Sequence, residues 1–211
     1  MEKRDFDAAL NQWQDVKGQV DGFTYWYNLG TLQTLRENYP EARYALEKAR
    51  FLTLYSDATE HQLRSVNQAL AVDTPSSTLE IGPHLANTLV YLGPMKLWFL
   101  AILVALVFLF SIKKTLSKKL RIGFLILGLV PLITTAWFHL SSVAFVALKP
   151  IEMYEGPSRV FAGGRALPAG AKVLGWSDGD WIKIYDENAQ TIWLSRSEVV
   201  MKAGWLWGNT L

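Results

Sequence analysis

The chain has 211 residues, of which 50% are hydrophobic and 19% are charged, and its formal net charge is +2. It contains no cysteine, which excludes disulfides, thiolate metal sites and a cysteine nucleophile. The eight Lys/Arg and twelve Asp/Glu of residues 1–95 give −4, and residues 141–211 are neutral, so the excess of positive charge lies in residues 96–121. A nucleic-acid-binding protein, which needs a basic face on a folded domain, is therefore not expected.

The first third of the chain has the apolar spacing of amphipathic helices. A stripe at i, i+3, i+4 and i+7 predicts a first helix and is formed by Phe6, Ala9, Leu10 and Trp13. A second helix is predicted at about residues 24–37. A third begins at Pro40, because proline suits the first helical position. A fourth begins at Asp57, which forms a capping box with Glu60. Since the turns are short, these helices are expected to pack as antiparallel neighbours.

Part of this region resembles a tetratricopeptide repeat, a helix pair of about 34 residues. The resemblance rests on the spacing of Trp26, Leu29, Gly30, Tyr39, Ala42, Leu46 and Ala49. It covers residues 23–56 and implies a helical-repeat domain over residues 1–75, in which the small Gly30 lets two helices approach closely. An unrelated four-helix bundle is the alternative.

The first helix of such a repeat lines a concave face that binds extended segments of partner proteins. The candidate partner-binding residues, on the side of this helix away from its repeat partner, are Tyr27, Asn28, Thr31 and Leu35. The amide of Asn28 can pair with a peptide backbone through both its donor and its acceptor. The alternative is that Asn28 only caps a neighbouring turn.

Two long apolar runs flank a basic loop in the middle of the chain. They follow a linker at residues 76–95. The end of this linker is expected either to lie against a membrane surface or to pack as an ordinary helix. Residues 96–112 and 122–140 predict two transmembrane helices, since about 20 mostly apolar residues cross a bilayer. The loop at 113–121 is predicted to be cytoplasmic because Lys and Arg are retained on that side. Its topology determinants are Lys113, Lys114, Lys118, Lys119 and Arg121. The arrangement predicts a multi-pass protein of the bacterial inner (cytoplasmic) membrane with both termini periplasmic.

The last third alternates short apolar runs with turn residues. Strands are predicted at residues 143–148, 171–176, 181–185 and 191–194, with turns at 155–158, 163–164 and 168–170. Short strands at this spacing are typical of a small barrel or sandwich.

The order of motifs in this part resembles a bacterial SH3 (SH3b) domain. The motifs are MYEGPS at 153–158, LPAG at 167–170, GDWIKI at 179–184 and TIWL at 191–194. The resemblance implies a small all-β SH3-like barrel over residues 143–203. Trp181 and Trp193 are expected in its core, because each lies in a strand-like run that contains apolar residues. Trp205 and Trp207 are candidate contact residues or belong to a further strand.

No motif for catalysis, for a cofactor or for a metal stands out. The sequence has no phosphate-binding glycine loop, nucleophile elbow or HExxH motif. The histidines are isolated along the chain, at His61, His84 and His139. A group of acidic residues fits turn chemistry better than a carboxylate cluster, and its members are Asp178, Asp180, Asp186 and Glu187. No catalytic, cofactor-binding or metal site is therefore predicted, and the protein is not expected to be an enzyme.

These segments predict a multidomain fold made of an α-helical tetratricopeptide-repeat-like domain, a two-helix transmembrane hairpin and a small all-β SH3-like barrel. This order resembles the repeat-bearing member of the Bacteroides aerotolerance (Bat) family, with YNLG at 27–30 and EGPS at 155–158 carrying the likeness. The resemblance implies a non-enzymatic inner-membrane scaffold for stress tolerance and envelope integrity. Its implied partners are von Willebrand factor A-type membrane proteins and a MoxR-type ATPase. The alternative is a peptidoglycan-binding envelope sensor that uses the SH3b domain, which an exposed aromatic groove would favour.

Overall fold

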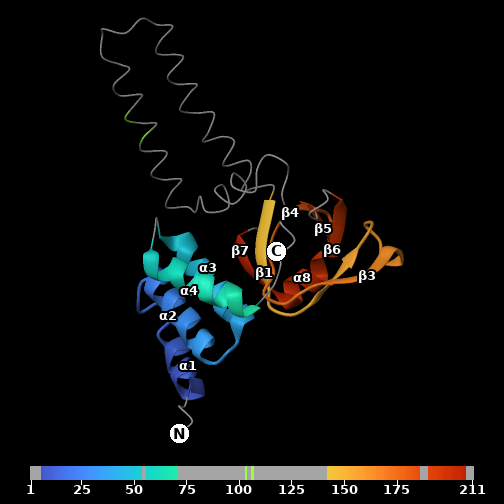
Figure 1. The fold of residues 1–211 in the computed structure, drawn as a ribbon. Coiled ribbons are helices and arrows are strands. Elements are labelled where there is room, and N and C mark those ends of the chain that lie inside the picture. The colour runs from blue at the N-terminus through green and yellow to red at the C-terminus, as the bar shows by residue number, and fades with distance from the viewer. Residues whose placement is uncertain are drawn as a thin grey trace, which may run out of the picture.

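The computed structural model of the chain describes residues 6–53, 56–70, 103, 106, 142–185 and 190–207. Most of these residues fall into two units that lie side by side (Figure 1). The helical unit comprises α1 (Phe6–Asp15), α2 (Gly22–Leu35), α3 (Tyr39–Leu52) and α4 (Asp57–Leu70). The β unit comprises residues 142–185 and 190–207 and contains a curled antiparallel sheet.

Local sequence signals explain where the helices of the helical unit begin. The Asp21 carboxylate accepts a hydrogen bond from the Thr24 amide at 2.9 Å and so caps α2. Pro40 lies in the first turn of α3, where no backbone donor is needed. The helices predicted at about 24–37, from Pro40 and from Asp57 are thus confirmed.

The closest approach within the helical unit is between α2 and α3. A Cβ atom placed on Gly30 would lie 2.6 Å from Cγ of the fully buried Leu46, so only glycine fits. The predicted role of Gly30 is therefore confirmed. A compact apolar core forms around this point and links α3 to α4 through Ala42, Leu46, Leu63 and Val66.

The β unit has seven strands within the described residues, in the order β3-β2-β6-β5-β4-β1-β7, and neighbouring strands are antiparallel. The strands are β1 (Ser142–Ala147), β2 (Ile151–Tyr154), β3 (Ala162–Leu167), β4 (Lys172–Asp178), β5 (Trp181–Tyr185), β6 (Thr191–Ser195) and β7 (Ala203–Trp207). A short 3-10 turn, η1 (Arg159–Phe161), precedes β3, and helix α8 (Arg196–Lys202) connects β6 to β7.

One apolar core lies inside the curl of the sheet. Every strand and α8 contribute to it, including Phe145, Ile151, Leu167, Val173, Ile182, Leu194, Val199 and Trp205. The ring centroids of Phe145 and Trp205 are 5.7 Å apart. Trp205 thus belongs to a further strand of the sheet, one of the two alternatives that its sequence position leaves open.

Strand β1 is buried on both of its faces, which is unusual for a sheet with one core. Phe145 faces the core of the β unit, whereas Ala144 and Val146 face a second apolar cluster together with Leu174 and Leu206. Tyr44 of α3 packs on this second cluster. The helical unit therefore covers the outer face of the sheet, as Figure 1 shows beside β1 and β7.

Charged side chains also cross this interface between the two units. Lys172 of β4 donates to the Glu47 carboxylate of α3 at 3.0 Å, and both side chains are largely buried. The Arg43 guanidinium donates to the Gly170 carbonyl at 2.7 Å, and the Lys48 ammonium donates to the Leu206 carbonyl at 3.0 Å. Because these contacts are directional, they fix the position of α3 on the sheet.

Burial alone would raise the pKa of Glu47. The charges of Lys172, Arg50 and Arg43, with the Lys172 hydrogen bond, outweigh this effect and hold the pKa of Glu47 below its ordinary value. Glu47 is therefore ionised at neutral pH, and the Lys172 ammonium has a buried counter-charge.

The transmembrane part of the predicted fold class is wrong for the residues that the structure describes. None of their helices is both long and apolar enough to cross a membrane. The longest, α2, α3 and α4, have 14 residues each and rise about 21 Å, against about 30 Å of bilayer core. This finding overturns the two-helix transmembrane hairpin and the multi-pass inner-membrane localisation.

The segments on which that prediction rested are hardly described. The linker at 76–95 and the basic loop at 113–121, with Lys113, Lys114, Lys118, Lys119 and Arg121, lie outside the described residues. The same holds for the predicted spans at 96–112 and 122–140, apart from Leu103 and Leu106.

The β unit also differs from the predicted all-β barrel. Residues 196–202 of this unit form a helix, α8, and the turn predicted at 163–164 lies inside β3. The ladder between β2 and β3 has an irregularity between Met153 and Tyr154, which lets the two glycines remain in a strand. The strands predicted at 143–148, 171–176, 181–185 and 191–194 are confirmed to within about two residues.

Candidate functional site

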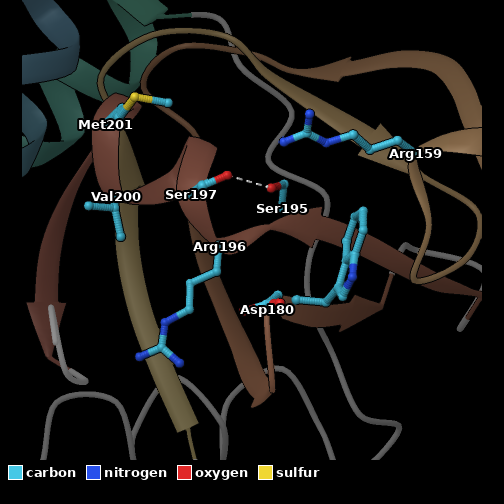
Figure 2. Close-up of a pocket in the computed structure, with 8 residues that line it drawn as sticks. Arg159, Asp180, Ser195, Arg196, Ser197, Val200 and Met201 are labelled. Carbon is cyan, nitrogen blue, oxygen red and sulfur yellow. Dashed lines mark hydrogen bonds between the residues drawn. The ribbon is translucent and has the colours of Figure 1, made fainter.

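A groove runs along α8 on the surface of the β unit, and we call it the α8 groove. It consists of two adjoining hollows, of about 760 Å³ and about 510 Å³. The larger is lined by Arg159, Asp180, Trp181, Ser195, Arg196, Ser197, Val200 and Met201. The smaller is lined by Glu152, Tyr154, Arg159, Ser197, Glu198, Met201 and Lys202. Figure 2 shows the larger hollow, in which the Ser195–Ser197 pair lies between Arg159 and Met201.

Helix α8 presents apolar side chains to the groove because it is short and contains consecutive apolar residues. Val199 is fully buried in the core and anchors the helix. Successive residues of a helix are about 100° apart, so the side chains that follow Val199 point outward. Val200 and Met201 are accordingly 46% and 72% exposed. The run Glu198-Val-Val-Met201 indicates this exposure in the sequence, since one helical turn cannot bury three consecutive apolar residues.

Two apolar side chains of η1 follow the groove residue Arg159 in the chain. Val160 is 88% exposed and Phe161 is 55% exposed. The ring of Phe161 packs on Gly156, where a Cβ atom would lie 2.9 Å from Cδ2 of the ring. This contact holds the turn in place while leaving much of both side chains accessible.

Trp181 lines the larger hollow instead of filling the core. The alternation along β5 buries Ile182 and Ile184 and leaves Trp181 half-buried. Its ring meets that of the buried Tyr154 edge-on, with centroids 5.3 Å apart. The prediction that Trp181 and Trp193 are core residues is therefore wrong, because the isoleucines and the leucine of β5 and β6 take the inner face. The tryptophans share the outer face with polar residues such as Lys183 and Thr191.

Tyr154 forms a hydrogen-bonded cluster with two carboxylates at the floor of the smaller hollow. Its hydroxyl donates to Glu152 Oε2 at 2.9 Å and lies 3.4 Å from Glu198 Oε1. The hydrogen bond to Glu152, then burial and the charge of Glu198, raise the pKa of Tyr154 to about 12. Glu198 in turn accepts from Lys202, one helical turn further on, at 2.9 Å.

The raised pKa of Tyr154 predicts a loss of stability in strong alkali. Since the folded pKa exceeds the unfolded one, this contribution is complete below pH 10 and disappears as the pH rises through about 12. A spectrophotometric titration of phenolate at 295 nm should show one tyrosine near pH 12 that is missing from Tyr154→Phe. A difference spectrum between the two proteins that titrates near pH 10 would contradict this assignment.

Arg196 is held by the turn between β4 and β5. Its guanidinium donates to Ser177 Oγ at 3.1 Å and approaches the Gly179 carbonyl at 3.5 Å. Its backbone amide donates to the Asp180 carbonyl at 2.9 Å. Arg196 therefore ties α8 to this turn, and Figure 2 shows its side chain extending away from Arg159.

The structure places the predicted partner-binding residues of the helical unit along α2. Thr31 exchanges hydrogen bonds with the Gln62 amide of α4, at 3.0 and 3.1 Å, and the Tyr27 hydroxyl accepts from the same amide at 3.2 Å. Asn28 is half-buried, and Leu35 is 51% exposed at the end of α2. Tyr27 and Thr31 thus meet α4 through Gln62, which sequence reasoning did not single out, and a binding role for the four residues stays a prediction.

Other chemistry is sparse in the described part of the chain. No group of three or more His, Asp or Glu residues there could hold a metal ion. His61 is exposed on α4, whereas His84 and His139 lie outside the described residues. Asp178 and Asp180 are exposed at the turn between β4 and β5, as expected for turn residues.

Comparison of the chain with protein-family models, with curated proteins and with solved structures finds no match. Its function has to be argued from its own residues.

Proposed function

We propose that the protein is a non-enzymatic adaptor that binds an extended segment of a partner protein in the α8 groove. The helical unit, fixed on the sheet by the Glu47–Lys172 pair, would hold a second contact face at a constant position. The Bat-type partners implied by the sequence resemblance, von Willebrand factor A-type proteins and a MoxR-type ATPase, stay predictions.

The observation that carries this proposal is the pair of exposed apolar side chains that line the groove from α8. Val200 and Met201 are 46% and 72% exposed, and two more exposed apolar residues, Val160 and Phe161, follow the groove residue Arg159 in η1. Large apolar side chains that gather around a hollow mark interaction sites more often than isolated ones do. Methionine suits this role because its flexible thioether adapts to different partner side chains.

The interior of the groove provides the polar contacts that orient a bound segment. The hydroxyls of Ser195 and Ser197, 2.9 Å apart, can each donate or accept. Trp181 offers a large flat surface with an indole N–H, a combination that is enriched among the residues that dominate binding energy at interfaces. The groove thus combines apolar side chains with polar groups that can orient a ligand, as ligand sites do.

A second candidate function is the binding of cell-wall peptide by the β unit. It is favoured by the position of Trp181, since an accessible aromatic side chain in the groove is the feature that distinguishes this function from a pure scaffold. Co-sedimentation of the purified protein with peptidoglycan sacculi distinguishes it from protein binding.

The proposal predicts that Met201→Asp and Trp181→Ala impair binding without unfolding the protein. The probe is a library of random 12-residue peptides displayed on phage and selected on the immobilised full chain. Affinities of enriched peptides should fall about tenfold or more in both variants, as expected for central contact residues. The midpoint of urea unfolding of Met201→Asp should shift little, because this side chain is mostly exposed.

Leu35→Asp is the matched control, because Leu35 is similarly exposed but lies on α2. It should bind the enriched peptides like the wild type. Loss of binding in Leu35→Asp alone would instead assign the function to the predicted face on α2, and binding of sacculi but of no peptide would favour the cell-wall function.

A further inference from the structure

The charged side chains of the α8 groove are mostly compensated within the protein. Glu198 and Lys202 form an ion pair at 2.9 Å. Glu152 accepts the hydroxyl of Tyr154 at 2.9 Å, which satisfies part of its carboxylate. The lining of the smaller hollow thus contains two carboxylates, Glu152 and Glu198, and its formal charges balance only when Arg159 is counted beside Lys202.

The larger hollow is also lined by Asp180 and Arg196. Asp180 lies in the turn between β4 and β5, and the Arg196 guanidinium of α8 donates to Ser177 of β4 and approaches the Gly179 carbonyl. Arg196 is thus held by these partners, and its side chain extends away from Arg159 (Figure 2).

Arg159 differs from these residues. In the described part of the chain it is the one charged residue that lines both hollows, and its side chain forms no hydrogen bond or ion pair with another described residue. It is exposed and stands directly before Val160 and Phe161 in η1. Figure 2 shows it on the side of the Ser195–Ser197 pair opposite Met201.

We infer that the segment bound in the α8 groove is acidic, with one Asp or Glu carboxylate on Arg159 and an aliphatic side chain beside it on Val200 and Met201. This inference rests on the proposed function of the groove. A guanidinium binds a carboxylate through two parallel hydrogen bonds, which gives both orientation and charge selectivity. The hydroxyls of Ser195 and Ser197 lie beside Arg159 and can donate to the same carboxylate or to the peptide backbone.

The test uses two phage libraries of random 12-residue peptides that differ only at one fixed central position, which is Glu in one and Gln in the other. The full-length wild type should enrich the Glu library over the Gln library. Arg159→Gln should lose this preference and bind the enriched peptides about fivefold more weakly, as expected for a partly exposed charged contact. Lys149→Gln, which removes an exposed cation of the β unit outside the groove, is the control and should keep the preference.

The outcomes separate this inference from the proposed function. In one outcome both libraries are enriched equally, and binding is abolished by Met201→Asp but unchanged in Arg159→Gln. This outcome overturns the acidic segment but keeps the groove as the binding site. Enrichment of neither library overturns both. If Lys149→Gln loses the preference for Glu as readily as Arg159→Gln does, the preference reflects a general attraction to the β unit. This result also overturns the assignment to Arg159.

Discussion

Replacing Glu47 with glutamine is expected to lower the free energy of unfolding by about 3–5 kcal/mol, the range found when one partner of a buried ion pair is removed. The reason is that the Lys172 ammonium, 12% exposed and 3.0 Å from the Glu47 carboxylate, would lose its counter-charge while remaining inside the interface. The loss should be measured by urea unfolding of the full chain, followed by circular dichroism.

Two further variants make this prediction specific. Glu47→Gln combined with Lys172→Met removes both charges and should recover most of the lost stability, because an apolar side chain of similar length fits a buried site. Glu60→Gln breaks the ion pair with Arg50, whose side chains are 29% and 28% exposed, and should cost under about 1 kcal/mol. Equal effects of Glu47→Gln and Glu60→Gln would contradict the buried position of the first pair.

The second large effect is expected in the core of the β unit. Phe145→Ala should destabilise the protein by about 3–5 kcal/mol, because it empties a fully buried site against Trp205. Trp181→Ala removes a larger side chain but should cost clearly less, since Trp181 is half-buried at the edge of the groove. The midpoints of thermal unfolding should therefore fall in the order wild type, Trp181→Ala, Phe145→Ala. The reverse order of the two variants would return Trp181 to the core.

The elements that could be predicted from the sequence are those with a local cause. Pro40 and the Asp57–Glu60 pair indicated the starts of α3 and α4, and the alternation of β5 and β6 indicated their length. The close contact at Gly30 followed from residue size alone. Each of these signals lies within one or two turns of the chain, where spacing and structure are directly related.

The features that could not be predicted depend on contacts between distant parts of the chain. Glu47 and Lys172 are 125 positions apart, and nothing in either neighbourhood shows that the other lies beside it. The core position assigned to Trp181 was wrong for a local reason, because Trp181 shares its face of β5 with Lys183, whereas Ile182 and Ile184 take the inner face. The apolar runs at 96–112 and 122–140 supported a transmembrane hairpin, which the helices of the described residues contradict.

The groove was missed for a related reason. Its residues come from η1, from the turn before β5 and from α8, and these segments meet only after the sheet has curled. The one local signal was the run of apolar residues at Val199–Met201. The candidate residues on α2 were easier to name because a single helix carries all four of them.

The burial of β1 on both faces decides how the protein can be divided for study. A fragment limited to residues 142–207 would retain the inner core but would uncover Ala144, Val146, Leu174 and Leu206 together, since Tyr44 and the rest of α3 would be gone. An apolar patch of this kind invites self-association. Binding measured on such a fragment would mix attraction to the bared sheet with attraction to the α8 groove. The groove is therefore best studied with α3 still attached, or with the four outer residues replaced by polar ones.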